Sequence, residues 1–139
     1  MGRRASREIA MKLLYQLEIQ KEDREEQIKY VLEENPLGDK DREYVTDIVE
    51  GVAQNLSIID KTIELHSKGW KIGRISKVDL SIMRLSIYEI CYRSDIPYSV
   101  SVNEAVELAK KYSNDDAGAF VNGILSKVSK AGMLPVEGG

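Results

Sequence analysis

Apolar residues recur every three or four positions along almost the whole chain, and this spacing constrains the fold more than any other feature. In residues 5–17, and again from Asp39 to Leu56, the apolar side chains fall on one stripe of a helix with 3.6 residues per turn. The same spacing predicts further helices over residues 24–34, 58–67, 77–92 and 102–112 and from about residue 116 onward. The pattern therefore predicts an all-α fold.

Polar residues at fixed offsets predict where the helices begin. Asp39 is a plausible N-cap, and Ser57, Ser76 and Ser101 are each followed three residues later by an acid, which is the capping-box pattern. Pro36 ends the second helix. Between two helices, residues 96–102 alternate in polarity around Pro97, so they are predicted to be an extended linker.

The helix predicted over residues 77–92 carries apolar side chains around most of its circumference, as expected of a central helix that neighbours cover on several sides. Its one glutamate, Glu89, is expected to pair with a cation such as Arg84 or Arg93. Cys91 in the same helix is expected to be a buried thiol. In the last helix, Gly123 is expected to mark a close approach between helices, because a glycine inside a helix costs about 1 kcal/mol.

Length and composition favour one domain in a reducing, cytoplasmic setting. The chain has 139 residues, enough for a core without disulfides or metals, and its single cysteine cannot form an internal bridge. No Cys or His spacing suits a metal site, and no apolar run exceeds three residues, so neither a membrane span nor a signal peptide is predicted. One domain is expected over residues 1–130, followed by a flexible tail over residues 131–139.

The net charge of −3 hides a segregated distribution. Residues 1–12 hold four basic side chains and one acidic, a net of +3, whereas residues 22–50 hold four basic and eleven acidic, a net of −7. Residues 61–93 hold seven basic and three acidic, a net of +4. Such blocks indicate either surfaces for different partners or solvated helix faces.

The sequence offers few of the residues and none of the motifs that enzymes commonly use for catalysis. His66 is the only histidine and lies on a predicted amphipathic helix, and no activating base accompanies Cys91. The chain has no glycine-rich phosphate loop and no nucleophile elbow. We therefore expect a protein that is not an enzyme and needs no cofactor.

The amino end suggests a contact with nucleic acid. Arg3 and Arg7, and likewise Arg4 and Arg7, are about one helical turn apart, so their guanidinium groups are expected to form a ridge beside the apolar stripe. Arginine binds phosphate oxygens in pairs and stacks on unpaired bases, which suits single-stranded RNA. A merely solubilising helix end explains the same residues equally well.

Nearly the whole chain resembles the NusB family of transcription antitermination factors. The matching residues are Arg3, Arg4, Arg7, Leu14, Tyr15, Trp70, Arg74, Arg84, Tyr88, Glu89, Ile96, Pro97, the run 103–110, the run 120–123 and Leu125. The run Asn-Glu-Ala at 103–105 and the run Phe-Val-Asn-Gly at 120–123 are the most specific of these.

The resemblance implies seven helices in two packed bundles, here expected over about residues 4–56 and 57–130. It also implies binding to the boxA element of ribosomal RNA leader transcripts together with NusE, a protein of the small ribosomal subunit, in a complex that helps RNA polymerase resist termination. The RNA contacts that it implies are Arg3, Arg4, Arg7, Lys110, Lys111 and Phe120.

For the surface that faces NusE, the resemblance points to Tyr15 and Asp79. Both residues also have structural explanations, Tyr15 as cover for the apolar stripe and Asp79 as part of the Ser76 capping box. One departure from the family is Ala119, where members commonly carry a basic residue just before the phenylalanine. Members also differ in whether they form homodimers, and the sequence leaves that state open.

Two other functions compete with this interpretation. The same helical module occurs at the front of some ribosomal RNA cytosine methyltransferases, but a methyl-transferring domain needs roughly another hundred residues. The other is a module for protein contacts alone, in which the acidic residues 22–50 form the working surface. Salt dependence of RNA binding would separate that alternative from an RNA-binding protein.

Overall fold

The computed structural model describes residues 2–128, which form seven α-helices, a short 3-10 turn and no strand. The helices are α1 (Arg3–Ile19), α2 (Arg24–Glu34), α3 (Asp39–Gln54), α4 (Leu56–His66), α5 (Lys77–Tyr92), α6 (Tyr98–Tyr112) and α7 (Asp115–Leu125), and the 3-10 turn is η1 (Ile72–Arg74). The predicted all-α class with about seven helices is confirmed.

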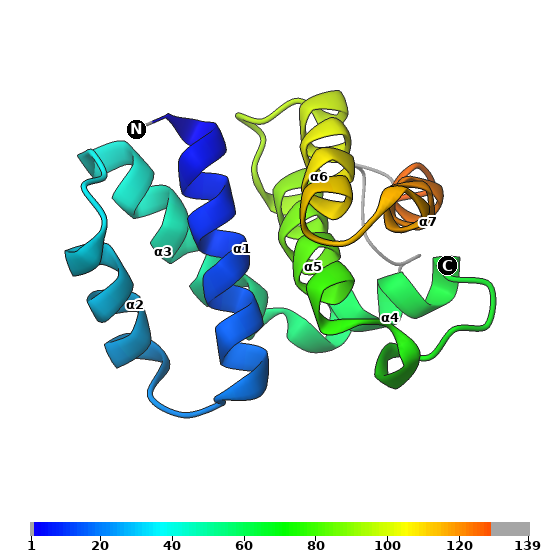
Figure 1. Ribbon diagram of the computed structural model, residues 1–139, viewed down its shortest axis with the longest axis horizontal. Coiled ribbons are helices and arrows are strands. Elements are labelled where there is room, and N and C mark those ends of the chain that lie inside the picture. The colour runs from blue at the N-terminus through cyan, green and yellow to red at the C-terminus, as the bar shows by residue number, and fades with distance from the viewer. Residues whose placement is uncertain (1, 129–139) are drawn as a thin grey trace.

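Helix α5 is the centre of the fold. Figure 1 shows α1, α2 and α3 on one side and α4, α6 and α7 on the other, with α5 between them. It packs against α1, α3, α4, α6 and α7, and every residue from Asp79 to Ile90 is buried. The prediction of a central helix covered on several sides is confirmed, and its burial supplies much of the hydrophobic stabilisation.

A glycine brings α3 and α5 into close contact, but it is not the predicted one. A Cβ atom at Gly51 of α3 would collide with the ring of Tyr88 on α5, so only glycine fits this crossing. The Tyr88 hydroxyl then donates to Asp47 of α3 at 2.9 Å. At Gly123 a Cβ would meet no atom of residues 2–128 within 4 Å, so the expectation that another helix approaches closely there is wrong.

Only one of the three predicted serine caps is found. The Oγ of Ser76 accepts a hydrogen bond from the backbone N–H of Asp79 at 3.1 Å and caps α5. Ser57 lies inside the first turn of α4, because α4 begins at Leu56 almost directly after α3 ends. Ser101 lies one turn inside α6, where its hydroxyl donates to the buried Glu89. The caps predicted at Ser57 and Ser101 are therefore wrong.

Two further boundaries differ from the predictions. The extended linker predicted over residues 96–102 is mostly helix, because Pro97 is the N-cap of α6 and the helix starts at Tyr98. Pro97 has the extended dihedrals of a residue just before a helix, so it marks a start and not a long linker. The N-cap of α3 is Gly38, and Asp39 is the first helical residue.

Some expectations concern exposure. Cys91 is partly exposed, so the prediction of a buried thiol is wrong. Within residues 2–128, none of the helices combines the length and apolar character that crossing a bilayer requires. The predicted tail over residues 131–139 lies outside the described residues.

Candidate nucleic-acid interface

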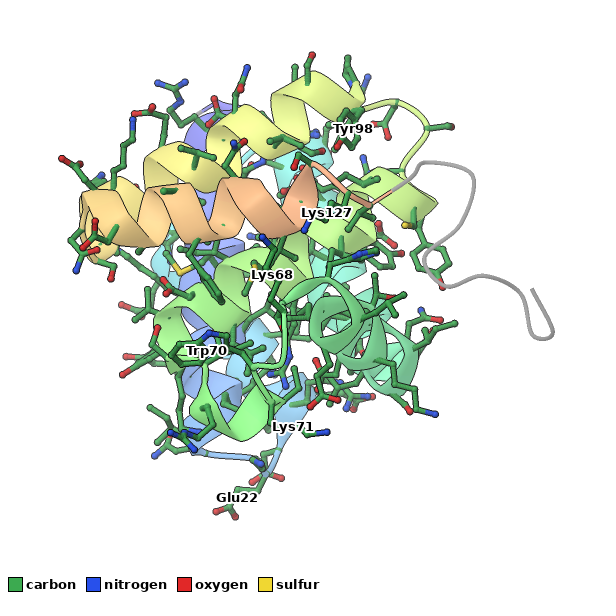
Figure 2. All side chains as sticks on the ribbon, turned by 90° about the vertical axis from the view of Figure 1, so that its right-hand side faces the viewer. Glu22, Lys68, Trp70, Lys71, Tyr98 and Lys127 are labelled. Carbon is green, nitrogen blue, oxygen red and sulfur yellow. The ribbon has the colours of Figure 1, made fainter. Side chains whose placement is uncertain are left out.

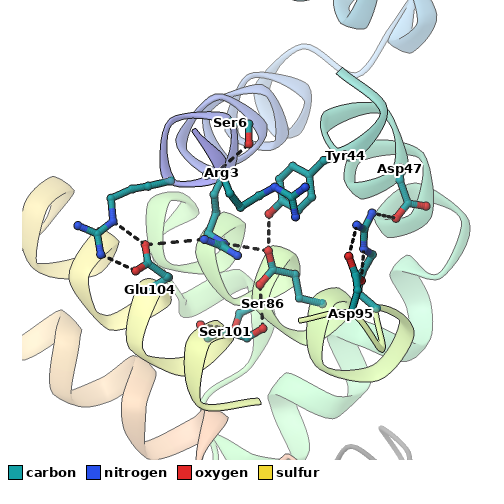
Figure 3. A network of polar contacts seen from close by, with 12 residues as sticks. Arg3, Ser6, Tyr44, Asp47, Ser86, Asp95, Ser101 and Glu104 are labelled. Atoms are coloured by element: carbon teal, nitrogen blue, oxygen red, sulfur yellow. Dashed lines mark hydrogen bonds and ion pairs between the residues drawn. The ribbon is translucent and has the colours of Figure 1, made fainter. Parts of the chain in front are cut away.

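Arg7 lies beneath the surface and not on a ridge. Its Nε donates to Oε2 of Glu89 at 2.9 Å, and the two side chains are 4% and 0% exposed. Glu89 also accepts hydrogen bonds from the hydroxyls of Tyr44 and Ser101, so the carboxylate has a partner from each of α1, α3 and α6 (Figure 3). This buried cluster fixes the first turn of α1 against three other helices.

The partner of Glu89 was predicted wrongly. Arg84 lies on another side of α5 and pairs with Glu18 and Asp60, at 2.8 Å in each case. Arg93, just past the end of α5, pairs with Asp47 at 3.0 Å and with Asp95 at 2.8 Å. Arg84 and Arg93 thus pair with other carboxylates, and Glu89 pairs with Arg7 of α1.

The cluster keeps its groups in defined protonation states. Burial works against the charge of Arg7, but its contacts with Tyr44 and with the Glu89 carboxylate raise its pKa overall. Burial and then the charge of Glu89 raise the pKa of Tyr44, which therefore stays a hydrogen-bond donor. Arg7 is accordingly a permanent cation whose role in this structure is to hold α1 in place.

Arg3 and Arg4 reach the surface above this cluster. The guanidinium of Arg3 lies 4.3 Å from the ring centre of Tyr44, and its Nε donates to Asp41 at 3.3 Å. Arg4 is 78% exposed and makes two hydrogen bonds to the carboxylate of Glu104 on α6, at 2.6 and 3.0 Å. Figure 3 shows Arg3, Tyr44 and Glu104 in one network of polar contacts.

Helix α6 adds two lysines next to α1. Lys111 is exposed, and its Nζ lies 2.7 Å from the carboxylate of Glu8 on α1. Lys110 lies 3.9 Å from Glu107 one turn earlier on its own helix. We refer to the predicted RNA contacts Arg3, Arg4, Lys110 and Lys111 as the basic seam. Arg4 and Lys111 bridge α1 and α6, whereas Arg3 faces α3 and Lys110 faces α7.

Each cation of the basic seam has a carboxylate within 4 Å. The acidic partners reduce the positive potential that an approaching phosphate meets, and they hold the long side chains in place. A phosphate that approaches such a cation competes with its carboxylate, and exposed pairs of this kind are weak. Glu104 is the acid that sequence reasoning missed, because it was interpreted only as a capping residue.

Phe120 lies on α7 and is partly buried. Its ring meets that of Trp70 edge to face, with the ring centres 6.0 Å apart and the planes at 64°. The side chain of Lys110 packs over Gly118 of α7, where an added Cβ would lie 2.9 Å from its Cγ.

Tyr15 and Asp79 lie near a second junction, between the later part of α1 and the start of α5. Here Lys77 lies 3.4 Å from Glu18, which is one turn after the 37% exposed Tyr15. The side chain of Asp79 is only 8% exposed, and its Oδ1 is buried without a hydrogen-bond partner in the described part of the chain. Burial accordingly raises the pKa of Asp79.

Comparison with known proteins places this arrangement among close relatives. The NusB family model matches residues 4–130. The chain is 67% identical to transcription antitermination protein NusB of Ruminiclostridium cellulolyticum, over 99% of this chain and 94% of the relative. It is 62% identical to the protein of the same name from Acetivibrio thermocellus, over 99% and 95% of the two chains.

Two solved structures show the same fold. The NusB of T. maritima superposes with a TM-score of 0.87 at 36% identity, covering 96% of this chain and 94% of the other. A chain from a crystal structure of the antitermination factors NusB and NusE in complex with double-stranded RNA superposes with a TM-score of 0.84 at 31% identity. That match covers 94% of this chain and 97% of the other.

Proposed function

We propose, for a chain that belongs to the NusB family of transcription antitermination factors, that it binds the boxA element of ribosomal RNA leader transcripts together with NusE. The complex helps RNA polymerase resist termination, and the protein works in the cytoplasm. Family membership confirms the predictions that the chain is a transcription antitermination factor and not an enzyme. Both curated relatives are antitermination proteins and not methyltransferases, which argues against the methyltransferase alternative.

One observation carries the RNA-binding proposal: the basic seam collects four predicted contacts from two helices that are far apart in the sequence. Arg4 is its most exposed arginine, and its pairing with Glu104 joins positions 100 residues apart. A planar guanidinium can exchange a carboxylate for a phosphate with little change in geometry. Arg3 and Arg4 therefore bind the RNA backbone, whereas Arg7 supports them from below.

The junction of α1 with α5 is the surface that we propose for NusE. A buried carboxylate oxygen without a partner, as in Asp79, is costly alone and gains a hydrogen bond when a donor docks against it. Tyr15 offers a partly exposed ring that carries a hydroxyl, and tyrosine is a common anchor in protein interfaces. The RNA surface and the NusE surface thus share helix α1.

Fluorescence anisotropy tests the proposal, with a labelled boxA RNA and a scrambled RNA titrated with and without NusE. We expect selective binding that NusE tightens and that the double variant Arg3→Ala, Arg4→Ala weakens. For single strands, the plot of log affinity against log salt should become shallower by about 0.7 for each phosphate that the variant no longer binds. Lys29→Ala, an exposed cation on α2, is the matched control.

Arg7 is left intact in this test, because its removal would disturb the buried cluster and confuse folding with binding. RNA binding that ignores sequence, or that the double variant leaves unchanged, would contradict the proposal. If NusE still bound in that case, the protein-interaction alternative would be favoured, with the acidic residues 22–50 as its candidate surface.

A further inference from the structure

A second group of cations surrounds the loop between α4 and α5, away from the first turn of α1. Lys68, Lys71 and Arg74 are exposed on this loop, and Lys127 is exposed just after α7. Figure 2 shows Lys68, Lys71 and Lys127 on the same side of the molecule as Trp70. We refer to these four cations together with Trp70 as the loop face.

The cations of the loop face differ from those of the basic seam in one respect. Among residues 2–128, no ion pair joins any of them to a carboxylate, whereas each cation of the basic seam has one. The nearest acid in the sequence is Glu64, whose Oε2 already accepts the backbone N–H of Ile72 at 2.8 Å. The loop face therefore presents positive charge that its own neighbours do not neutralise.

The loop that carries these cations is held in a defined shape. Lys68 and Gly69 have φ values of 54° and 93°, so the chain turns sharply after α4. The hydroxyl of Ser67 closes the turn by donating to the carbonyl of Trp70 at 2.7 Å. Lys127 lies near the end of α4, where burial and the charge of Lys127 together lower the pKa of His66.

Trp70 lies on the same side of the molecule as these cations (Figure 2). It is 50% exposed, although a large aromatic ring usually gains by burial. One side of the indole is supported by Phe120, which meets it edge to face. An aromatic ring held in this way among cations is the arrangement on which single-stranded nucleic acids stack their bases.

We propose that the loop face is a second contact for single-stranded RNA, in which a base stacks on Trp70 while the surrounding lysines and Arg74 bind the flanking phosphates. The proposal rests on the RNA-binding function proposed above. Phe120 on α7, one of the predicted RNA contacts, meets Trp70 edge to face, so the loop face adjoins that part of the proposed RNA surface.

Trp70 is the only tryptophan in the chain, so intrinsic fluorescence reports on this position alone. The wild-type protein is titrated with a boxA RNA extended by several nucleotides at either end, while the anisotropy of a labelled copy is followed in parallel. We expect the emission of Trp70 to be quenched with the same midpoint as the rise in anisotropy. A rise in anisotropy with unchanged emission overturns the loop face but not the proposed function, whereas no binding in either signal overturns both.

Substitutions then separate stacking from charge. Trp70→Ala should weaken binding of the extended RNA about fivefold or more, and Trp70→Phe, which keeps a ring, should retain most of the affinity. Lys68→Ala combined with Lys71→Ala should reduce the salt slope by about 0.7 for each phosphate that these lysines bind in the wild type. Tyr30→Ala, which removes a 63% exposed ring from α2, is the matched control.

A protein is the other candidate for this face, and the same signal distinguishes it. If the Trp70 emission changes when NusE is added alone but not when RNA is added, the face belongs to the protein partner and the RNA assignment is wrong. Equal loss of affinity for Trp70→Ala and Trp70→Phe, with both variants folded by circular dichroism, would also contradict stacking.

Discussion

Arg7 and Glu89 lie 82 positions apart in the sequence and form a buried ion pair, with 2.9 Å between Nε and Oε2. The pair joins the first helix to the central one directly below the exposed arginines. Glu89 also accepts hydrogen bonds from the hydroxyls of Tyr44 and Ser101, so each of its two carboxylate oxygens has a partner. Stability and the placement of the proposed RNA contacts therefore depend on the same four side chains.

Replacing Arg7 should destabilise the protein strongly. Arg7→Met removes the cation and leaves Glu89 buried without its charge partner, which costs about 3–5 kcal/mol in the free energy of unfolding. Urea denaturation followed by circular dichroism measures this loss. In the double variant Arg7→Met, Glu89→Leu, part of the stability should return, because no unpaired charge remains. A loss below about 1 kcal/mol in the single variant would contradict the importance of the pair.

Releasing Arg4 should strengthen RNA binding. Glu104→Gln keeps the size of the side chain but removes the negative charge that competes with phosphate for Arg4. Exposed pairs of this kind are weak, so the expected gain in affinity is about two- to fivefold at low salt, and it should shrink as salt is added. Anisotropy titration with boxA RNA measures the gain.

Glu33→Gln, an exposed charge change on α2, is the control for the general effect of lowering the negative charge. An equal gain in both variants would assign the effect to net charge. A loss of affinity in Glu104→Gln would show that the carboxylate positions Arg4 for RNA instead of competing with it.

The sequence was informative where local physics decides the structure. Helical periodicity predicted α5 as the centre, because a helix covered on all sides needs apolar residues all round. The capping pattern was right at Ser76 and wrong at Ser57, since the same motif occurs inside a first turn when the preceding helix ends close by. The partner of Glu89 could not be predicted, because packing between distant helices selects Arg7 over cations nearby in the sequence.

In the candidate site, too, the local sequence pattern was predictable and the contacts between distant helices were not. The basic amino end was visible as a charge pattern, and the family resemblance added Lys110, Lys111 and Phe120. The carboxylates that hold this charge come from other helices, as Glu104 does for Arg4, so their role depends on tertiary structure. The exposure of Trp70 beside Phe120 likewise follows from how the loop after α4 meets α7.

The charged form of Asp79 should lower the free energy of unfolding, and this penalty should disappear as the pH falls. Its pKa is raised by burial, so the folded state binds the proton more readily than the unfolded state. The penalty is therefore fully present above the raised pKa and disappears as the pH falls below the unfolded value, which is near 3.8. Asp79→Asn should stabilise the protein at pH 7 by about 1 kcal/mol.

Urea midpoints for wild type and Asp79→Asn between pH 3 and pH 7 measure this difference. The two curves should converge at the acid end, and the same substitution should weaken NusE binding if the buried oxygen meets a donor from that partner. A constant gap across the pH range would mean that the charge of Asp79 carries no penalty. Glu25→Gln, on the exposed start of α2, controls for the general titration of surface acids.

Two helical glycines should respond in opposite ways to alanine. Gly51→Ala places a methyl group against the ring of Tyr88, so the ring or the two helices must shift, at a cost of about 1–3 kcal/mol in the free energy of unfolding. In the part of the chain that the structure describes, the methyl group of Gly123→Ala would meet no atom within 4 Å, so alanine's higher helix propensity should stabilise α7 by about 0.5–1 kcal/mol. Thermal unfolding of both variants tests this, with a lower midpoint temperature expected for Gly51→Ala and a higher one for Gly123→Ala.

The pair also tests whether Gly123 has a function beyond packing. If Gly123→Ala is more stable than wild type but binds boxA RNA less well, the position is kept small because a ligand approaches α7 there. If stability rises and binding is unchanged, the glycine has no role that the fold or the RNA requires. A fall in stability would mean that a neighbour absent from residues 2–128 packs against α7 at this point.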